Sequence, residues 1–172
     1  TLKPHPLTKV STCMLKHLQI GVHSILEITD INKELSQKAS RLLKANHINQ
    51  GSLGNCYFMS SIASLVEYYP EFLSKLFIFD VNPSGMYVVK LFNDGEWTNI
   101  VLDDRFPCEG GKPIFSKPHD NEIWVLLLEK AWAKLHGSYQ SIESGNALEA
   151  LVALTGALVQ SFSDKEGLFR FV

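Results

Sequence analysis

Residues 121–136 restrict the fold of this chain more than any other segment. Asp120 or Asn121 can cap the start of a helix here, and Gly137 can end it after His136. The central stretch Trp124–Leu128 is apolar on every side, so a helix in this segment has no face suited to water. We therefore predict a central helix that the rest of the chain must cover. The composition permits this, since 45% of the residues are hydrophobic.

Two further helices are indicated by apolar spacing and by capping residues. One starts at Asn55 and is ended by Pro70, because proline removes a backbone donor and clashes with the preceding turn. Its apolar residues recur at the spacing of one helix face: Phe58, Ile62, Leu65, Val66 and Tyr69. The other starts at Asn146, where Glu149 three residues later completes a capping-box pattern, and runs to about Thr155.

A small antiparallel sheet is predicted between these helices. Residues 87–92 and 97–102 are rich in β-branched and aromatic side chains, and Asn93-Asp94-Gly95 between them favours a hairpin turn. Residues 76–81 are a candidate third strand, whereas the glycines and prolines of residues 104–119 indicate a long loop. The predicted class is α+β, mostly helical with a small antiparallel sheet.

Length and charge limit the kinds of protein that this chain can be. Its 172 residues suit one sizeable domain. The formal net charge of -2 provides no basic field for nucleic acid or for an anionic membrane. No apolar run reaches the roughly 18 residues of a transmembrane helix. The N-terminus lacks the apolar core of a secretory leader. Because the chain begins with Thr1 and not with an initiator Met, we expect it to be a piece of a longer protein.

The three cysteines lie far apart, at positions 13, 56 and 108. An odd number without a CxxC pair argues against a disulfide scaffold and against a structural zinc site. A reducing setting fits this pattern best, so we predict an intracellular, cytoplasmic protein.

Cys56 has a sequence context that suits a nucleophile. It falls in the first turn of the helix predicted from Asn55, where free backbone N–H groups and the helix dipole favour a thiolate. Gly51 and Gly54 allow the preceding loop to turn sharply and to approach a ligand closely. Gln50 could fold back and donate a hydrogen bond to an oxyanion. The alternative is that Cys56 is a small residue of the core.

The stretch Gln50-Gly51-Ser52-Leu53-Gly54-Asn55-Cys56-Tyr57 resembles the active-site segment of the calpain family of cysteine proteases. That family usually has Asp and Trp where this chain has Asn55 and Tyr57. Further segments resemble the family in the same order, namely residues 95–97, 102–107, 121–139 and 145–156. The resemblance covers residues 47–156. It implies that residues 1–46 are a partly helical N-terminal extension and that residues 47–172 are the first, cysteine-bearing subdomain of the protease core.

The extension is expected to hold a short helix near residues 14–20 and a second helix from Asp30 or Asn32 to about Lys44.

The resemblance implies a papain-like half-fold and a Cys–His–Asn triad that is divided between two subdomains. By position, Cys56 is the nucleophile, Gln50 is the oxyanion donor, and the backbone of Gly145 holds the substrate. The histidine and asparagine would come from a second subdomain, because their Gly-His and Asn-Pro-Trp segments do not occur in this sequence. The implied substrates are proteins.

Calcium is the cofactor that the resemblance implies. Members of the family bind one ion in each subdomain, and in the first subdomain Glu122 occupies one of the two carboxylate positions. His47 occupies the other, where an Asp is expected, and imidazole is a poor ligand for calcium. Glu122 also has a simpler interpretation, as a carboxylate that a helix N-terminus favours.

Three readings of the function remain at this level. The first is a calcium-dependent cysteine endopeptidase of which this chain carries only the nucleophile and the oxyanion donor, so that it is inactive alone. The second is a calpain-like module without catalysis that acts in interaction or regulation. The third, which sets the resemblance aside, is an intracellular α/β binding domain with a buried thiol.

Overall fold

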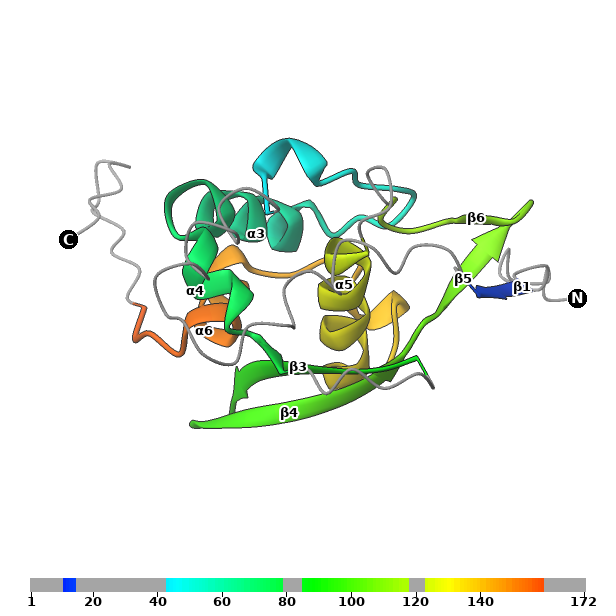
Figure 1. Ribbon diagram of the computed structural model, residues 1–172. Helices are drawn as coiled ribbons and strands as arrows, with labels where there is room; N and C mark the ends of the chain where they lie inside the picture. Colours follow the sequence, from blue (N-terminus) through cyan, green and yellow to red (C-terminus); the bar gives the residue numbers. More distant parts are fainter. Residues whose placement is uncertain (1–10, 15–42, 79–84, 118–122, 160–172) are drawn as a thin grey trace, which may run out of the picture.

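The computed structural model describes residues 11–14, 43–78, 85–117 and 123–159 (Figure 1). It confirms the α+β class. In chain order the elements are β1 (Ser11–Met14), the 3-10 helix η2 (Ala45–His47), α3 (Cys56–Tyr68), α4 (Pro70–Ser74), β2 (Phe77–Ile78), β3 (Met86–Asn93), β4 (Glu96–Asp103), β5 (Arg105–Glu109), β6 (Lys112–Pro113), α5 (Trp124–Leu135), the 3-10 helix η3 (Gln140–Ile142) and α6 (Ala147–Thr155).

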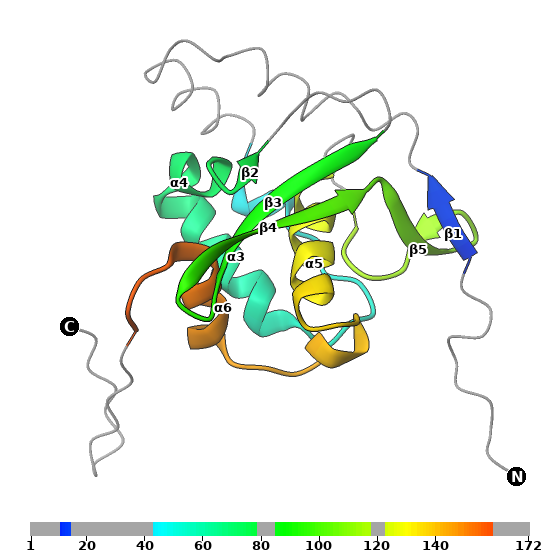
Figure 2. The same cartoon turned by 90° about the horizontal axis from the view of Figure 1, so that it is seen from below.

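Helix α5 is central, as its sequence predicts. In Figures 1 and 2 it lies beside the helices α3 and α6, on the same side of the β3–β4 hairpin as they do. Nine of its side chains are buried: Trp124, Val125, Leu126, Leu127, Leu128, Glu129, Ala131, Trp132 and Ala133. His136 is the C-cap and Gly137 follows with φ +90, which glycine adopts easily. The predicted N-terminal caps, Asp120 and Asn121, lie outside the described residues.

Helices α3 and α6 pack beside each other, and their predicted starts are confirmed. Asn55 is the N-cap of α3, and Asn146 caps α6 by accepting a hydrogen bond from the backbone N of Leu148 at 2.9 Å. Glu149 reaches across to the ring of His136 on α5 at 3.3 Å. Glu149 is predicted to complete a capping box at the start of α6, and it instead contacts the C-cap residue of α5.

Pro70 has two roles in the structure. It follows Tyr69, the C-cap of α3, so it ends that helix as predicted. It is also the first residue of α4, a short helix that the sequence analysis missed. Proline suits this first position because its fixed φ is helical and its missing N–H would have no partner there.

The predicted hairpin is confirmed. The candidate third strand over residues 76–81 is confirmed at Phe77–Ile78, and residues 79–81 lie outside the described residues. Strands β2, β3 and β4 form one antiparallel sheet, in which Phe92 pairs with Trp97 and Phe77 pairs with Val89. Asp94 and Gly95 make the turn with φ +50 and +88, as expected for an Asp-Gly hairpin. The sheet covers one side of α5 (Figure 2).

The prediction of a loop over residues 104–119 is wrong in part. Strands β5 and β6 lie within it, and β5 pairs with β1 on one side and with β6 on the other in a second antiparallel sheet. Gly110 and Gly111 form the turn between them with φ +57 and +76. Because β6 has only two residues and contains Pro113, no alternating pattern marks it.

In the N-terminal region, Met14 belongs to β1 and not to the expected short helix. Residues 15–20 and nearly all of the helix expected to end near Lys44 lie outside the described residues.

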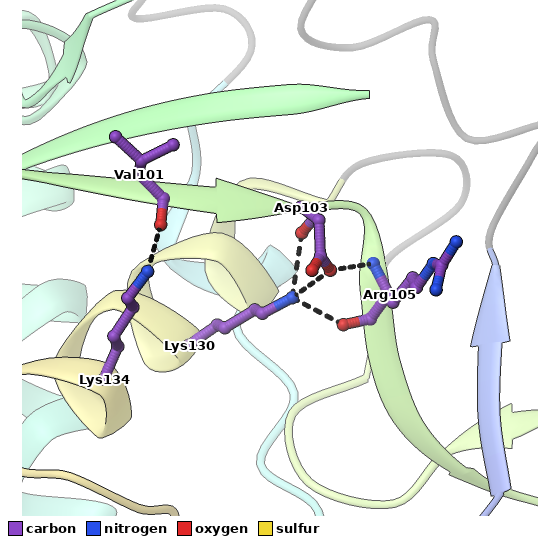
Figure 3. Close-up of polar contacts among 5 residues, drawn as sticks. All are labelled: Val101, Asp103, Arg105, Lys130 and Lys134. Atoms are coloured by element: carbon purple, nitrogen blue, oxygen red, sulfur yellow. Dashed lines mark hydrogen bonds and ion pairs between the residues drawn. The ribbon is translucent and has the colours of Figure 1, made fainter. Parts of the chain in front are cut away.

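Lys130 joins α5 to the corner between β4 and β5 (Figure 3). Its Nζ donates to the backbone O of Asp103 and of Arg105 at 2.9 and 2.6 Å, and it pairs with Asp103 Oδ1 at 2.5 Å. Partial burial, the largest single cause, would raise the pKa of Asp103, but the hydrogen bonds from Lys130 and from the backbone N of Arg105, together with the positive charges of both side chains, outweigh it and lower that pKa. Asp103 therefore has a structural role. It links the end of β4 to α5 through Lys130, and it also accepts a hydrogen bond from the backbone N of Arg105.

The cysteines depart from the expected pattern. Cys108 is disulfide-bonded, whereas Cys56 is a free cysteine. The expectation concerned a disulfide scaffold, and it did not foresee a single disulfide at Cys108. Spacing in the sequence does not show that β1, a distant segment, lies beside β5.

Candidate active site

Cys56 is the first residue of α3, and its side chain is exposed. The reading of Cys56 as a small core residue is therefore wrong for this chain. The residues that follow it on the inner face of α3, Phe58 and Met59, are buried. The helix thus presents the thiol at its outer end while its body packs into the core.

The loop before Cys56 is attached to the segment 114–117. Ser52 donates to the backbone O of Ile114 twice, from its N at 3.0 Å and from its Oγ at 2.8 Å. Lys117 N donates to Asn49 O at 2.8 Å. Gly51 lies so close to this segment that a Cβ there would be 1.5 Å from the backbone O of Phe115. The glycine is therefore required by the close approach of two backbones.

Gln50 is at the start of this loop and is exposed. Its Nε2 donates to the backbone O of Leu53 at 2.6 Å, which folds the side chain back along the loop. The amide is thus held on the turn that leads to Cys56.

Gly145 lies against the residue that follows Cys56. A Cβ on Gly145 would be 2.4 Å from the ring of Tyr57, and a Cβ on Gly54 would be 2.9 Å from the backbone O of Glu143. The segment 143–145 therefore packs against Gly54, which precedes Cys56, and against Tyr57, which follows it. The structure brings Gly145 to the same end of α3 as Cys56, although 89 residues separate the two in numbering.

Tyr57 is the contact on which this end of α3 depends. Its hydroxyl donates to Ile142 O at 3.3 Å and accepts from Trp132 Nε1 at 3.0 Å. Burial raises the pKa of Tyr57, while the hydrogen bond from Trp132 opposes the shift. Tyr57 thereby joins α3 to α5 and to η3.

A buried carboxylate that the sequence analysis did not single out lies beneath the site. Glu129 on α5 accepts hydrogen bonds from Asn55 Nδ2 at 2.8 Å and from Ser116 N and Oγ at 2.8 and 2.6 Å. All three residues are buried. The signal in the sequence was an acidic residue directly after the apolar stretch Trp124–Leu128, where a buried charge needs partners.

Asn55 is fully buried, and its Oδ1 has no hydrogen-bond partner among the described residues. Its Nδ2 bond to Glu129 fixes the residue directly before Cys56 to the central helix. This contact is available to Asn, because a carboxylate at this position would need a proton to face Glu129.

The two predicted calcium ligands are not brought together by the described part of the structure. His47 ends η2 and is half-buried, and Glu122 lies outside the described residues. No group of three or more His, Cys, Asp or Glu side chains that could hold a metal occurs among the residues described. The donor set also fits calcium poorly, because an imidazole replaces a carboxylate at position 47.

The described helices are also all too short or too polar to cross a membrane.

The sequence is similar to one protein family and to several curated proteins. The family model of the calpain family cysteine protease matches residues 27–171, so it begins within the segment read as an N-terminal extension. Among curated proteins, the chain is 43% identical over 136 residues to "Calpain-type cysteine protease ADL1" of Oryza sativa subsp. japonica, which covers 74% of this chain and 6% of that protein.

Two other relatives are similar over shorter stretches. The chain is 46% identical over 110 residues to "Calpain-type cysteine protease DEK1" of Arabidopsis thaliana, covering 62% of this chain and 5% of the relative. It is 42% identical over 114 residues to "Calpain-12" of Homo sapiens, covering 63% and 16%. The chain thus spans a small part of each relative's length. From the family match over most of its residues, the chain belongs to the calpain family of cysteine proteases.

Proposed function

We propose that this chain is the cysteine-bearing half of a calpain-type endopeptidase that cleaves protein substrates. Cys56 is the proposed nucleophile. The observation that carries the proposal is an exposed, free cysteine at the first residue of a helix whose inner face is buried. The N-terminal turn of a helix favours the negative charge of a thiolate, which is the nucleophilic form.

In the proposed reaction the thiolate sulfur of Cys56 bonds to the carbonyl carbon of a peptide. Gln50 Nε2 leaves Leu53 O, or uses its second N–H, to donate to the oxygen that becomes negative. The C–N bond then breaks, and the amine leaves with a proton from a histidine of the second subdomain. Water later hydrolyses the thioester. The backbone of Gly145, at the same end of α3, is the proposed contact for the substrate.

Two parts of this proposal, the second subdomain and calcium, rest on the family resemblance. The second subdomain is the proposed partner, since it would supply the histidine and the asparagine that orients it. Calcium dependence is proposed for the whole enzyme only, because the residues at the expected ligand positions of this half do not suit the ion. No step of the reaction is assigned to calcium. An intracellular, cytoplasmic place of action stays a prediction from the sequence, and the disulfide at Cys108 is the observation against it.

The first experiment measures hydrolysis of a fluorogenic peptide by the chain alone and by the chain joined to the second subdomain of a related calpain-type protease. We expect no measurable hydrolysis by the chain alone, because loss of the general base from a triad costs on the order of 10⁶-fold in kcat. The joined protein should cleave, and Cys56→Ala should abolish that cleavage. Gln50→Ala should lower kcat by about 10²-fold or more, the effect of removing one oxyanion donor.

Two outcomes would contradict the proposal. Hydrolysis by the chain alone that Cys56→Ala abolishes would show that the missing histidine is not needed. A joined protein that folds and is inactive, although the donor subdomain works with its own partner, would favour the reading of a module without catalysis.

A further inference from the structure

A cavity of about 330 Å³ lies on the molecule where the end of α5, the middle of α6 and the tip of the β3–β4 hairpin meet. None of the residues proposed for catalysis lines it. Its lining consists of Phe92, Asn93, Asp94, Gly95, Trp132, Leu135, His136, Glu149, Val152 and Ala153.

The inner part of the cavity is apolar. Trp132 and Ala153 are buried, and Phe92, Leu135 and Val152 are partly buried around them. A dry apolar cavity of about 150 Å³ is large enough to take up benzene. The volume here therefore accommodates a phenyl-sized or butyl-sized group together with a short polar end.

Each lining side chain that carries an N–H group has at least one acceptor within the protein. Trp132 Nε1 donates to the Tyr57 hydroxyl, and Asn93 Nδ2 donates to Asp94 Oδ2 at 2.8 Å. Both ring nitrogens of His136 face acceptors, Nδ1 the backbone O of Trp132 at 3.1 Å and Nε2 the carboxylate of Glu149 at 3.3 Å. The polar groups that remain for a ligand are therefore mainly carboxylate lone pairs.

The rim of the cavity carries a net negative charge. Asp94 and Glu149 are both exposed at the mouth, and His136 is the single basic residue in the lining. Two carboxylates against one imidazole leave a net charge of -2 when the ring is neutral and -1 when it is protonated. A ligand with a positive charge is favoured in either state.

From these contacts we propose that the cavity is a binding site for a compact apolar group that ends in a protonated amine. The apolar part lies against Trp132 and Val152, and the ammonium lies between Asp94 and Glu149. A free arylalkyl amine and the lysine side chain of a protein segment share this chemistry. The site does not depend on the proposed protease function, although Trp132 contacts Tyr57, the residue that follows Cys56.

The test is an NMR titration of the ¹⁵N-labelled 172-residue chain with three probes of similar shape: phenethylammonium, 2-phenylethanol and 3-phenylpropionate. The observed signal is the indole N–H of Trp132, assigned with Trp132→Phe, and the signal of Trp124 is the internal control. We expect a saturable shift with phenethylammonium and affinity for the neutral alcohol that is weaker by about three- to fivefold, which is the contribution of an exposed ion pair. Phenylpropionate should bind more weakly still.

Variants test the role of the two carboxylates. Glu149→Gln and Asp94→Asn should each weaken phenethylammonium binding by about threefold. Glu143→Gln, which removes an exposed carboxylate outside the cavity, should leave it unchanged. Since Glu149→Gln also removes the contact with His136, Asp94→Asn provides the independent measurement.

A parallel titration with N-acetyl-lysine-N-methylamide separates the two sources of the amine. Saturation by this probe supports a protein segment, and its absence supports a small amine.

The proposal is overturned if the three probes bind equally, if the carboxylate binds best, or if neither variant changes the affinity for the amine. It is also overturned if phenethylammonium gives no saturable shift of the Trp132 signal.

Discussion

Glu129 holds the residue before the proposed nucleophile in place. Its carboxylate has three hydrogen-bond donors around it, from Asn55 on the α3 side and from Ser116 on the loop that follows β6. A buried donor that loses its acceptor costs about 1–3 kcal/mol, whereas a satisfied one contributes less than that. The position of Asn55, and with it the start of α3, therefore depends on an acceptor at position 129.

Two substitutions at this position separate charge from hydrogen bonding. Glu129→Leu fills a similar volume but leaves the three donors unpaired, so we expect a loss of about 3 kcal/mol or more in the free energy of unfolding. Glu129→Gln retains one acceptor oxygen and should cost less. Urea unfolding measures both, with Glu143→Leu as an exposed control whose effect should be within about 0.5 kcal/mol. Equal effects of Leu and Gln would contradict the importance of the acceptor.

Glu129 also predicts a pH dependence of stability. Burial raises the pKa of Glu129 above its ordinary value of 4.5, and the hydrogen bonds from Ser116 and Asn55 oppose part of this shift. The folded chain therefore binds the proton more tightly than the unfolded chain does. This contribution to the free energy of unfolding is fully present below the unfolded pKa, and it is lost as the pH rises through the folded pKa.

The measurement compares the wild type with Glu129→Gln, which does not titrate at this position. The difference between their free energies of unfolding should become smaller as the pH rises from about 4.5 to neutrality. A difference that grows over this range would mean that the pKa of Glu129 is lowered in the folded chain.

Cys56 should be alkylated first among the cysteines. Its thiol is exposed at a helix start, and Cys108 is disulfide-bonded and buried. We expect limiting iodoacetamide at neutral pH, without reductant, to modify Cys56 before any other position, as determined by peptide mapping. Labelling of Cys108 at an equal rate would contradict the disulfide as well as the proposed reactivity of Cys56.

At the scale of elements, the loop 50–54 owes its shape to the segment 114–117. An alanine at position 51 would place its Cβ 1.5 Å from the backbone O of Phe115, so Gly51→Ala must separate the two segments. We expect this change to lose both Ser52 bonds to Ile114 and to cost about 2 kcal/mol or more. Ser52→Ala is the matched control, since it removes only the Oγ bond and should cost about 1 kcal/mol.

Amide hydrogen exchange identifies the cause. Exchange at the Ser52 amide should be faster in Gly51→Ala and little changed in Ser52→Ala. If the amide of Ser52 remained protected in both variants, the loop would not be held by the contact at Gly51.

At the scale of the whole molecule, calcium should have little effect on this half of the core. His47 stands where the family resemblance implies an Asp, and the charge of the ligands helps to set calcium affinity. We expect the melting temperature of the chain to be unchanged in millimolar calcium. His47→Asp restores a carboxylate, so its melting temperature should rise with calcium and not with magnesium.

A clear rise of the wild-type melting temperature with calcium alone, lost in Glu122→Gln, would show that the imidazole does not prevent binding.

Local patterns were enough to predict the main elements and the candidate nucleophile. The apolar run of α5, the face of α3, the Asp94-Gly95 turn and the cap at Asn146 each depend on neighbours within a few residues. These patterns are read directly from the sequence because propensity, capping and turn geometry are local properties. The stretch around Cys56 also resembled its family without any knowledge of the fold.

The tertiary structure decided what depends on contacts between distant segments. Cys108 forms a disulfide, Glu129 accepts from Asn55 Nδ2 across 74 positions, and Gly145 packs on Tyr57. Strand β6 also exists only because β5 pairs with it. No local pattern specifies such partners, because burial makes an unpaired polar group costly without saying which residue will pair with it. The sequence by itself thus determined the elements and the thiol, whereas the fold determined which side chains support that thiol.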